Sequence, residues 1–491
     1  MTIAHSGFRS RDDLRRWIAL VVVCFGQLMV VLDATIVNVA LPAIQRDLGF
    51  SQTDLTWVVN AYAISYGGFV LLAGRLGDLA GRKRVFLVGV LLFTIASAIC
   101  GTARTPELLV AARFAQGLGS ALSAGVIIAI IVTGFPEPRE RARAMSAFAF
   151  TVAGGGSLGL LAGGFLTQSM NWHWVFFINL PIGLATLVAG AALVADDAGA
   201  GLRRGVDVAG SVLVTAAVMT AVYAIVTADG SGWTSARTLG LAAASAVLMG
   251  AFFWLQARID NPILPLRILG IRSLMGASAA RGLLATGMFT TFFLGALYLQ
   301  QVRAYSALGT GLAFLPFTLV LAAMSLGITV RLVDRFGSRR VLLAGLLCIA
   351  GSLLLQSSVG PGTAYFPRLF VTYALFGLGA GVSLMPLTLL AMADVPVADA
   401  GLAAGITNVS MQVSAALGLA ALGSVAADHT RSLLAAGTAP PAALTGGFQL
   451  AFTIAACLVG GAVIVVLVAL RPPRAVAVPE AEHEAGLPPA A

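Results

Sequence analysis

Fourteen apolar runs, each about long enough to cross a lipid bilayer, occupy most of this 491-residue chain. A membrane-spanning helix needs about 20 predominantly apolar residues. Charged residues make up only 10% of the chain, whereas they make up about 25% of a soluble protein. The sequence therefore predicts an all-α membrane protein with fourteen transmembrane helices. The runs are Trp17–Leu41, Leu55–Gly74, Val85–Ala103, Leu108–Phe135, Met145–Gln168, Trp174–Ala195, Val208–Ala228, Thr238–Leu255, Leu274–Gln300, Leu308–Val330, Val341–Val359, Phe366–Ala393, Gly401–Ala427 and Gly447–Leu470.

The positive charges alternate between the loops that join these runs. Cytoplasmic loops carry an excess of Lys and Arg. With the N-terminus inside, the inner segments hold 22 of the 30 Lys and Arg residues, although the inner loop from Asp394 to Ala400 holds none. Both termini are therefore predicted to be cytoplasmic, with a disordered tail over 471–491. The Arg-for-Lys bias and the Ala and Gly content indicate a bacterial cell (inner) membrane.

Several classes of site are not indicated by the composition. The only lysine, Lys83, follows Arg82, so it cannot complete a nucleotide-binding P-loop. The four histidines lack metal-ligand spacing, and the four cysteines lie inside apolar runs. The net charge of +9 follows the membrane topology and is not read as a nucleic-acid footprint. We expect no metal, no nucleic acid, no enzymatic activity and no cofactor other than a coupling proton.

Two motifs repeat along the chain. The segment from Arg75 to Arg84 shares its Arg, Leu, Asp, Gly and basic end with the segment from Arg331 to Arg340, 256 residues later. Gly117-Leu-Gly119 is echoed by Gly377-Leu-Gly379, and we expect these glycines to allow close helix packing. Parallel repeats of this kind are typical of alternating-access carriers. The predicted division is a cytoplasmic segment 1–16, a six-helix bundle 17–195, an inserted helix pair 196–273, a six-helix bundle 274–470 and the tail.

Four motifs occur in a fixed order on successive helices. They are Leu32-Asp33-Ala-Thr-Ile-Val-Asn38-Val-Ala-Leu-Pro42, the loop from Gly74 to Arg84, Arg113-Phe-Ala-Gln116-Gly117-Leu-Gly119, and Asn171-Trp-His-Trp174-Val-Phe-Phe-Ile-Asn179-Leu-Pro181-Ile-Gly183. With them the chain resembles, over nearly its whole length, the fourteen-helix drug:proton antiporters of the major facilitator superfamily. The resemblance implies a major facilitator fold and proton-coupled export of hydrophobic, preferentially cationic drugs or toxic metabolites. Its partners are then the substrate, protons and the bilayer.

The chain departs from this family at three points. Leu160 stands where the antiporter motif usually has a proline, which keeps a proton-coupled importer or symporter of an organic solute open. Leu79 replaces the basic residue that usually follows Asp78, and Met411 stands where the family often has arginine. A channel or non-transporting receptor is the alternative of another class, and the paired halves argue against it.

Asp33 is the only acidic residue deep inside a predicted span. It lies nine residues before Pro42, roughly 13 Å below the outer end, and Arg113 lies roughly 9 Å below that end. Intramembrane charges usually face a partner or a cavity and mark ion pathways. Burial favours the neutral form of a carboxyl group, whereas a nearby cation favours its charged form. A carboxyl group balanced between these two effects can exchange a proton for a drug. The alternative is a static ion pair that only fixes helix packing. An Asp33 carboxyl group without access to a cavity would favour this alternative.

Further polar side chains are predicted to line the cavity of such a carrier. Arg113 and Gln116 share one helix face with Ser120, which indicates a water-lined surface. Arg281 has two open interpretations. Either it biases the substrate site against permanent cations, or it pairs with the C-terminus of a helix. Trp172 and Trp174 are expected to anchor a helix at the membrane interface. The predicted cavity-lining residues are Asn38, Tyr62, Gln116, Arg281, Asn408 and Gln412.

Two further groups of residues are predicted to act in the conformational change. The resemblance implies a gating role for the loop after the second run, and the repeat extends it to the other half: Arg75, Asp78, Gly81, Arg82, Arg84 and Asp334. Glycine is costly in a helix unless backbones must approach closely. The fifth run is rich in it, which favours a helix that bends or slides, with static packing as the alternative: Gly155, Gly159, Gly163 and Gly164.

Overall fold

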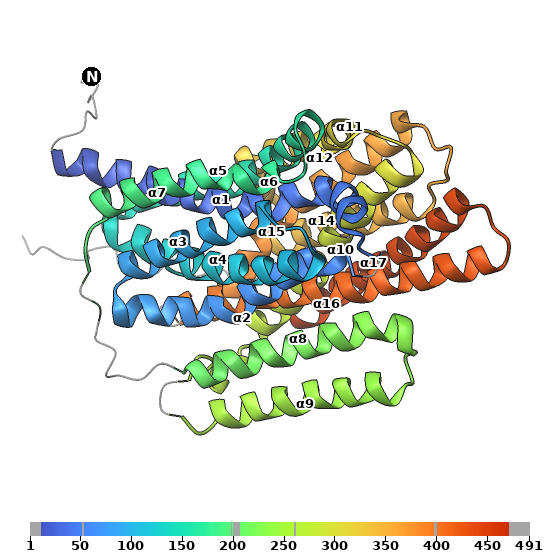
Figure 1. Cartoon of the computed structure of the whole chain (residues 1–491). Coiled ribbons are helices and arrows are strands. Elements are labelled where there is room, and N and C mark those ends of the chain that lie inside the picture. The colour runs from blue at the N-terminus through green and yellow to red at the C-terminus, as the bar shows by residue number, and fades with distance from the viewer. Residues whose placement is uncertain are drawn as a thin grey trace, which may run out of the picture.

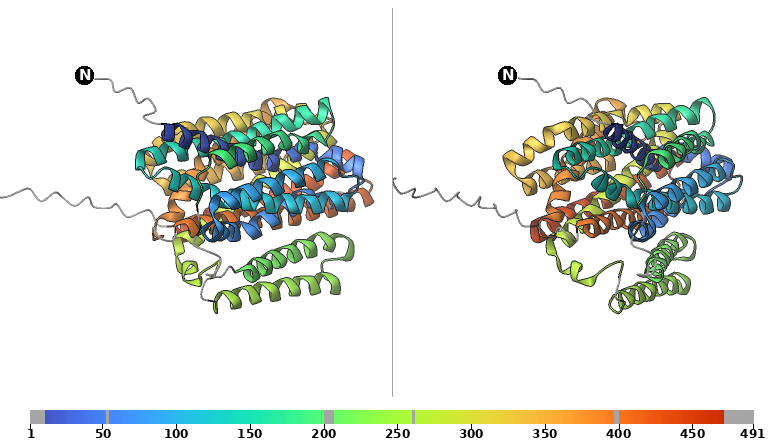
Figure 2. Two further views of the ribbon diagram at one scale, coloured as in Figure 1. Left: turned by 60° about the vertical axis from the view of Figure 1, so that its left-hand side comes forward. Right: turned by 90° about the vertical axis from the view of Figure 1, so that its left-hand side faces the viewer.

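The computed structural model describes residues 11–51, 54–197, 199, 207–259, 262–396 and 400–470, and its regular elements are all helices (Figure 1). The predicted tail 471–491 lies outside these residues. Long helices run side by side in one bundle, and two more lie against one flank of it (Figures 1 and 2). Helices suit an apolar environment because their backbone groups are satisfied within each segment.

The first group, here called the N-terminal helices, precedes the segment that leads to residue 207. Within it α4 packs between α2 and α3, while α1 packs along α5 and α7. Thr105 caps α4 by accepting a hydrogen bond from the Leu108 amide at 3.3 Å. The members are α1 (Arg11–Leu48), α2 (Thr56–Ala80), α3 (Arg82–Gly101), α4 (Pro106–Gly134), α5 (Pro138–Ser169), α6 (Trp174–Phe177) and α7 (Asn179–Leu193).

The second group, the C-terminal helices, follows a short 3₁₀ turn, η2 (Leu266–Gly270). Here α15 packs on α14 and α12, and α10 packs on α16 and α17. The members are α10 (Arg272–Leu297), η3 (Tyr298–Val302), α11 (Ala307–Ala313), α12 (Leu315–Ala323), η4 (Met324–Ile328), α13 (Thr329–Phe336), α14 (Ser338–Ser357), η5 (Tyr365–Leu369), α15 (Phe370–Met392), α16 (Ala400–Ala435) and α17 (Pro440–Ala469).

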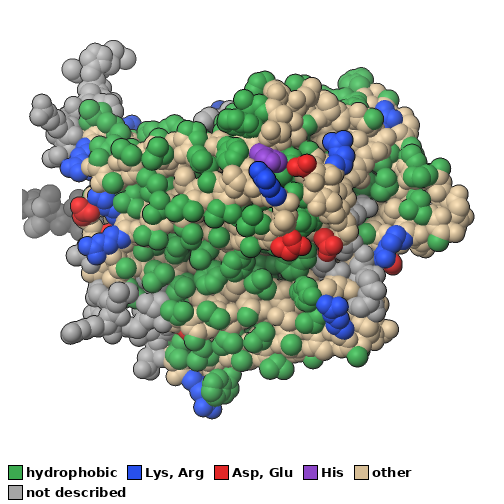
Figure 3. Space-filling model, in the orientation of Figure 1, with side chains coloured by type: hydrophobic (Ala, Val, Ile, Leu, Met, Phe, Trp, Pro, Cys, Tyr) green, Lys and Arg blue, Asp and Glu red, His purple; other side chains and the backbone are tan. Residues whose placement is uncertain are grey.

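Eleven helices in the described part of the chain are long and apolar enough to cross a membrane. Charged side chains gather towards the ends of the molecule in Figure 3, with hydrophobic side chains between them. The three other predicted runs fall on α2, on α5 and on the series α11–α12–η4–α13, so the count of fourteen stays a prediction. That series is interrupted by the π-helical turn η4, where Gly327 has a φ of +116°.

The repeated Gly-Leu-Gly motif packs in the same way in both groups. A Cβ on Gly117 of α4 would lie 2.3 Å from the Tyr62 carbonyl oxygen of α2. A Cβ on Gly377 of α15 would lie 2.3 Å from the Phe317 carbonyl oxygen of α12. The close helix packing predicted for these glycines is confirmed, because only glycine leaves room for such backbone contacts.

The inserted pair, α8 (Val208–Ser231) and α9 (Ala236–Gln256), forms the flanking layer in Figure 1. Helix α8 contacts α2 and α16, one helix from each group, and α9 packs on α8. Asp207 caps α8 by accepting from the Gly210 amide at 2.7 Å, and Gln256 Nε2 donates to the same carboxylate at 2.5 Å. The contact with α2 and α16 is an apolar cluster of Ala63, Ile64, Val218, Val222, Ala416 and Ala420.

The two groups are joined at one end of the bundle. We call the end where α1 begins and α17 ends the terminal end. Among the described residues, the recorded hydrogen bonds between the groups are three at the opposite end and a longer one, from Asn408 Nδ2 to Tyr66 Oη at 3.4 Å, eight residues from the start of α16. The opposite-end bonds are Gln300 Nε2 to Val39 O (2.9 Å), Gln301 Nε2 to Gln45 Oε1 (2.9 Å) and the Leu308 amide to Gln168 Oε1 (3.1 Å).

The α5 glycines bring this helix against the part of α1 that carries Asp33. A Cβ on Gly159 would lie 2.0 Å from Thr35 Oγ1 and 2.8 Å from the Leu32 carbonyl oxygen. Gly155 and Gly163 meet the same helix one turn away on either side, at Leu28 and at Ile36. A Cβ on Gly164 would instead lie 2.7 Å from the Ala307 carbonyl oxygen of α11. Close packing explains all four positions, and a sliding role for them stays a prediction.

We predict that Gly159→Ala destabilises the protein and that Gly156→Ala does not. The new methyl group at 159 would overlap backbone of α1, and overpacking of this kind costs about 1–3 kcal/mol. A Cβ at Gly156 meets nothing closer than 3.9 Å. Thermal unfolding of the two purified variants in detergent is the measurement, and equal melting temperatures would contradict the packing described.

Candidate functional site

A fully buried ion pair joins α1 and α4. Arg113 Nη1 lies 2.5 Å from Asp33 Oδ2, and the side chains are 1% and 0% exposed. Helix α1 carries the carboxylate and α4, which runs in the opposite direction, carries the guanidinium. The equal depth inferred from the sequence thus corresponds to direct contact.

Two amide side chains complete the polar cluster. Gln116 Nε2 donates to Asp33 Oδ1 at 2.8 Å, and Asn179 Nδ2 of α7 donates to the same oxygen at 3.1 Å. Gln116 Oε1 accepts from Arg113 Nη1 at 2.7 Å, and Ser97 Oγ of α3 accepts from Gln116 Nε2 at 2.8 Å. We call Asp33, Ser97, Arg113, Gln116 and Asn179 the buried charge network. It joins four helices of the N-terminal group.

An aromatic wall encloses the guanidinium of this network. Arg113 Cζ lies 4.4 Å from the ring centroid of Tyr62 and 5.9 Å from that of Phe176. Arg113 Nε donates to the Val58 carbonyl oxygen at 2.8 Å. Cation–π contacts of this kind are worth about 2 kcal/mol or more when desolvated. Groups on α1, α2 and α4 therefore hold the guanidinium of Arg113 in place.

The predicted open cavity around Arg113 and Gln116 is not present in this conformation. Both side chains are buried, as are Tyr62 (3%) and Asn38 (4%), which we expected to line it. Asn38 Nδ2 donates within its own helix, to the Ala34 carbonyl oxygen at 3.1 Å. In this conformation the ion pair and the aromatic wall use the polar surface internally, and a water-lined face in another conformation stays a prediction.

A chain of side chains connects this cluster to the other group of helices. Tyr62 stacks on Tyr66 with ring centroids 6.3 Å apart, and Asn408 Nδ2 of α16 donates to Tyr66 Oη at 3.4 Å. Gln412 of α16 is 8% exposed and packs against Gly67 of α2. A Cβ built on Gly67 would lie 3.0 Å from the Gln412 Cβ. Asn408 and Gln412 therefore lie at the contact between the groups, and only Asn408 is partly exposed.

The predicted gating loop follows α2 at the terminal end. Arg75 and Asp78 lie in α2, but their side chains are outside the part that the structure describes. Gly81 has a φ of +99°, which fits glycine at this turn between α2 and α3. Arg84 and Asp334 are exposed, and no partner of Asp334 is recorded among the described residues.

An acidic residue far along the chain holds the start of α3. The Arg82 amide donates to Asp197 Oδ2 at 2.9 Å and the Lys83 amide to Asp197 Oδ1 at 3.3 Å. Lys83 Nζ also pairs with Asp196 at 3.0 Å. A carboxylate at a helix N-terminus satisfies its free amides and complements its dipole. The sequence analysis missed this contact because Asp197 belongs to the segment after α7.

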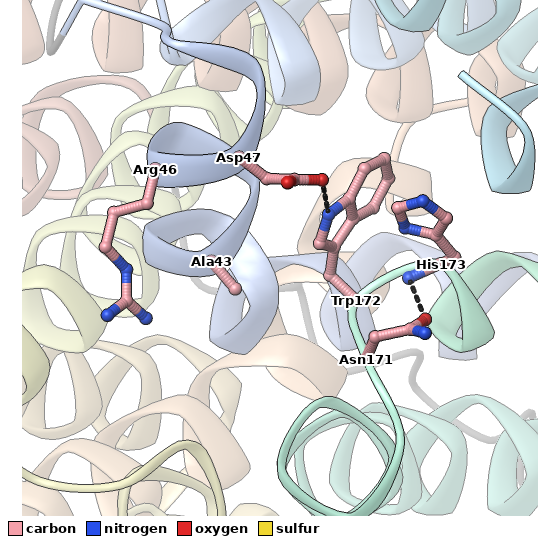
Figure 4. Close-up of a pocket in the computed structure, with 6 residues that line it drawn as sticks. All are labelled: Ala43, Arg46, Asp47, Asn171, Trp172 and His173. Carbon is pink, nitrogen blue, oxygen red and sulfur yellow. Dashed lines mark hydrogen bonds between the residues drawn. The ribbon is translucent and has the colours of Figure 1, made fainter. Parts of the chain in front are cut away.

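A separate pocket of about 570 Å³ lies at the opposite end, between the end of α1 and the turn before α6 (Figure 4). Trp172 Nε1 donates to Asp47 at 2.8 Å, so this buried residue is a packing partner rather than the predicted interface anchor. Trp174, 42% exposed, keeps that prediction open. Burial lowers the pKa of His173, with Arg104 acting the same way and Asp47 opposing it. Trp172 also packs edge-on against Phe176, with ring centroids 6.1 Å apart, and Phe176 in turn lies against Arg113 of the buried charge network.

Comparison with known proteins identifies the family. A model of the Major Facilitator Superfamily matches residues 23–419 and 277–491. The chain belongs to this superfamily. It is therefore a multi-pass membrane transporter and not an enzyme.

Its relatives in the superfamily include drug and antibiotic export proteins. The chain is 37% identical over 458 residues to the puromycin resistance protein of Streptomyces alboniger, covering 93% of this chain and 91% of that one. It is 33% identical to the lincomycin resistance protein of Streptomyces lincolnensis, with 98% and 96% covered. The tetracenomycin C resistance and export protein of Streptomyces glaucescens is 33% identical, with 87% and 79% covered.

Solved structures share the fold. A bacterial homologue of the human lysosomal transporter Spinster, in an inward-facing conformation, matches with a TM-score of 0.62 at 15% identity, covering 93% of this chain and 97% of that one. A transporter of the POT family matches with a TM-score of 0.65 at 16% identity, covering 92% of this chain and 98% of that one.

We predict strong coupling between Asp33 and Arg113 in a double-mutant cycle. Arg113→Gln leaves a buried carboxylate without its cation, which costs about 3–5 kcal/mol. Asp33→Asn removes that carboxylate, so Arg113→Gln should cost much less in the Asp33→Asn background. Thermal unfolding of the three variants and the wild type gives the coupling energy. Additive effects would show that the pair does not stabilise the fold as a unit.

Proposed function

We propose that this superfamily member is a proton-coupled secondary transporter that exports hydrophobic drugs or toxic metabolites by alternating access. The buried Asp33–Arg113 pair is the observation that carries the coupling, because it is an intramembrane carboxylate held by a cation on a facing helix. The near full-length similarity to the puromycin and lincomycin resistance proteins supports the direction and the type of substrate.

In this proposal the ion pair is a closed resting state. Asp33 is enclosed in the present conformation, so a proton reaches it only when the helices around it move. Protonation of Asp33 removes the partner of Arg113 and weakens the contact of α1 with α4. Each proton that enters down a membrane potential supplies about 2.3 kcal/mol per 100 mV. A static ion pair that only fixes helix packing is the competing role, and the experiment below separates the two.

The asymmetric closure of the bundle supports alternating access. Hydrogen bonds join the two groups at the end opposite the termini. With the charge-based orientation, in which both termini are cytoplasmic in a bacterial membrane, this corresponds to an inward-facing state. Opening the other way would break these bonds, and the loops at Asp78 and Asp334 would then close the terminal end. The fourteen spans and the two six-helix halves, 17–195 and 274–470, belong to the same proposal.

The geometry around Asp33 indicates the charge of the substrate less directly than it indicates the coupling residue. A cationic drug would have to displace Arg113, because the carboxylate already accepts three hydrogen bonds from the protein. We therefore propose hydrophobic compounds as the class and retain cationic drugs as an expectation of the family resemblance.

We predict that Asp33→Asn abolishes export driven by a pH gradient in inside-out vesicles while the protein remains folded. Asparagine keeps an acceptor oxygen for Arg113 but carries no proton to exchange. Uptake of a fluorescent drug is measured after an imposed pH step, with Asp428→Asn, at an exposed position, as the matched control.

Folding of both variants is checked by size-exclusion chromatography and thermal unfolding. Full gradient-driven export by Asp33→Asn would refute the coupling role and favour the static pair. In whole cells, an uncoupler should raise drug accumulation. A fall in accumulation would identify the alternative, a proton-coupled importer, for which Leu160 was the sequence argument.

A further inference from the structure

A second intramembrane arginine, Arg281, lies on α10 in the C-terminal group. It is nine residues from the start of α10, roughly 13 Å into the helix from the terminal end. Its neighbours Ala280 and Leu284 are almost fully buried in the hydrophobic core, whereas Arg281 is partly exposed. Its side chain therefore points away from the packed face of α10.

The guanidinium of Arg281 has little to bind within the protein. Its one recorded hydrogen bond runs from Nη1 to Thr388 Oγ1 of α15, at 3.3 Å. Thr388 Oγ1 donates in turn to the Leu384 carbonyl oxygen at 2.9 Å, so its lone pair faces the arginine. Arg281 Nε is buried and has no hydrogen-bond partner among the described residues. A guanidinium has five N–H donors, so most of this one's are unused.

No carboxylate in the described part of the chain forms an ion pair with Arg281. The described acidic residues that follow α9 are Asp334, Asp394 and Asp428, all of them exposed, and only Asp428 is recorded in an ion pair, with Arg431. Arg113 differs in every respect, because it has a carboxylate, an amide, a carbonyl and an aromatic ring around it. The N-terminal helices thus neutralise their intramembrane cation with Asp33, whereas no carboxylate among the described residues neutralises Arg281.

We propose that Arg281, with Thr388 beside it, is the subsite that binds an anionic group of the transported molecule. A charge held within the membrane is costly unless it is paired, so a partner supplied by the substrate would stabilise it. A planar guanidinium matches the two oxygens of a carboxylate. The preferred substrates are then hydrophobic acids or zwitterions rather than permanent cations. This inference rests on the proposed transport function and names its substrate class.

The position of Arg281 suits loading from the terminal end. It lies roughly 13 Å from that end, and the hydrogen bonds of Gln300, Gln301 and Leu308 that join the two groups lie at the opposite end. In this arrangement the C-terminal helices hold the substrate's negative group through Arg281, and the N-terminal helices exchange the proton through Asp33.

Equilibrium binding to the purified protein tests this assignment without any gradient. The probes are a rhodamine with a free benzoate and its methyl ester, which differ only in the anionic group, and fluorescence anisotropy gives both affinities. The wild type should bind the acid about ten-fold more tightly than the ester, as expected for a hydrogen-bonded charge. Arg281→Gln should remove this preference without weakening ester binding, and Arg281→Lys should restore part of it.

Arg303→Gln is the matched control, because Arg303 is a partly exposed arginine at the opposite end whose Nη1 donates to the Pro361 carbonyl oxygen at 2.7 Å. It should retain the full preference for the acid. A wild type that binds the two dyes equally, or binds neither, overturns the assignment. So does an Arg281→Gln variant, folded by thermal unfolding, that keeps the preference. Failure of the proposed proton coupling would instead appear as an Asp33→Asn variant that still exports, with dye preference unaffected.

Discussion

The buried pair of Asp33 and Arg113 is the interaction on which the N-terminal helices depend. Separating two charges inside a low-dielectric interior leaves each with a large desolvation cost, so the helices that carry them are held in register. Gln116 and Asn179 satisfy the remaining carboxylate oxygen and bring α7 into the same network. A carrier can use such a cluster because one proton changes its charge balance and therefore its packing.

Close backbone contacts give the framework within which this cluster can move. Glycines of α4 and α15 meet carbonyl oxygens of α2 and α12 in the same way, so the two groups of helices are built on a common plan. Glycines of α5 meet α1 beside Asp33, and Gly164 of the same helix meets α11. Helix α8 contacts both groups and covers one side of their junction.

Much of this could be predicted from the sequence, because hydropathy and loop charge reflect the bilayer directly. The predicted runs lie on the observed helices, and Asp33 and Arg113 were expected at similar depth. The rotation of each helix was not predictable, so Asn179 was quoted only as part of a motif and Ser97 was missed. The enclosure of Arg113 by Tyr62 also depends on tertiary packing. The break at Gly327 was missed because an apolar run looks the same whether its helix is regular or interrupted.

In the proposed cycle Asp33 binds a proton when the surrounding helices expose it and releases that proton when the ion pair with Arg113 forms again. The direct measurement is the proton movement that an imposed gradient of an exported drug drives across proteoliposome membranes, followed with a pH-sensitive dye inside the vesicles. A drug gradient should drive proton movement through the wild type and none through Asp33→Asn. Drug movement through the wild type without proton movement, or equal proton movement through Asp33→Asn, would contradict the coupling role of Asp33.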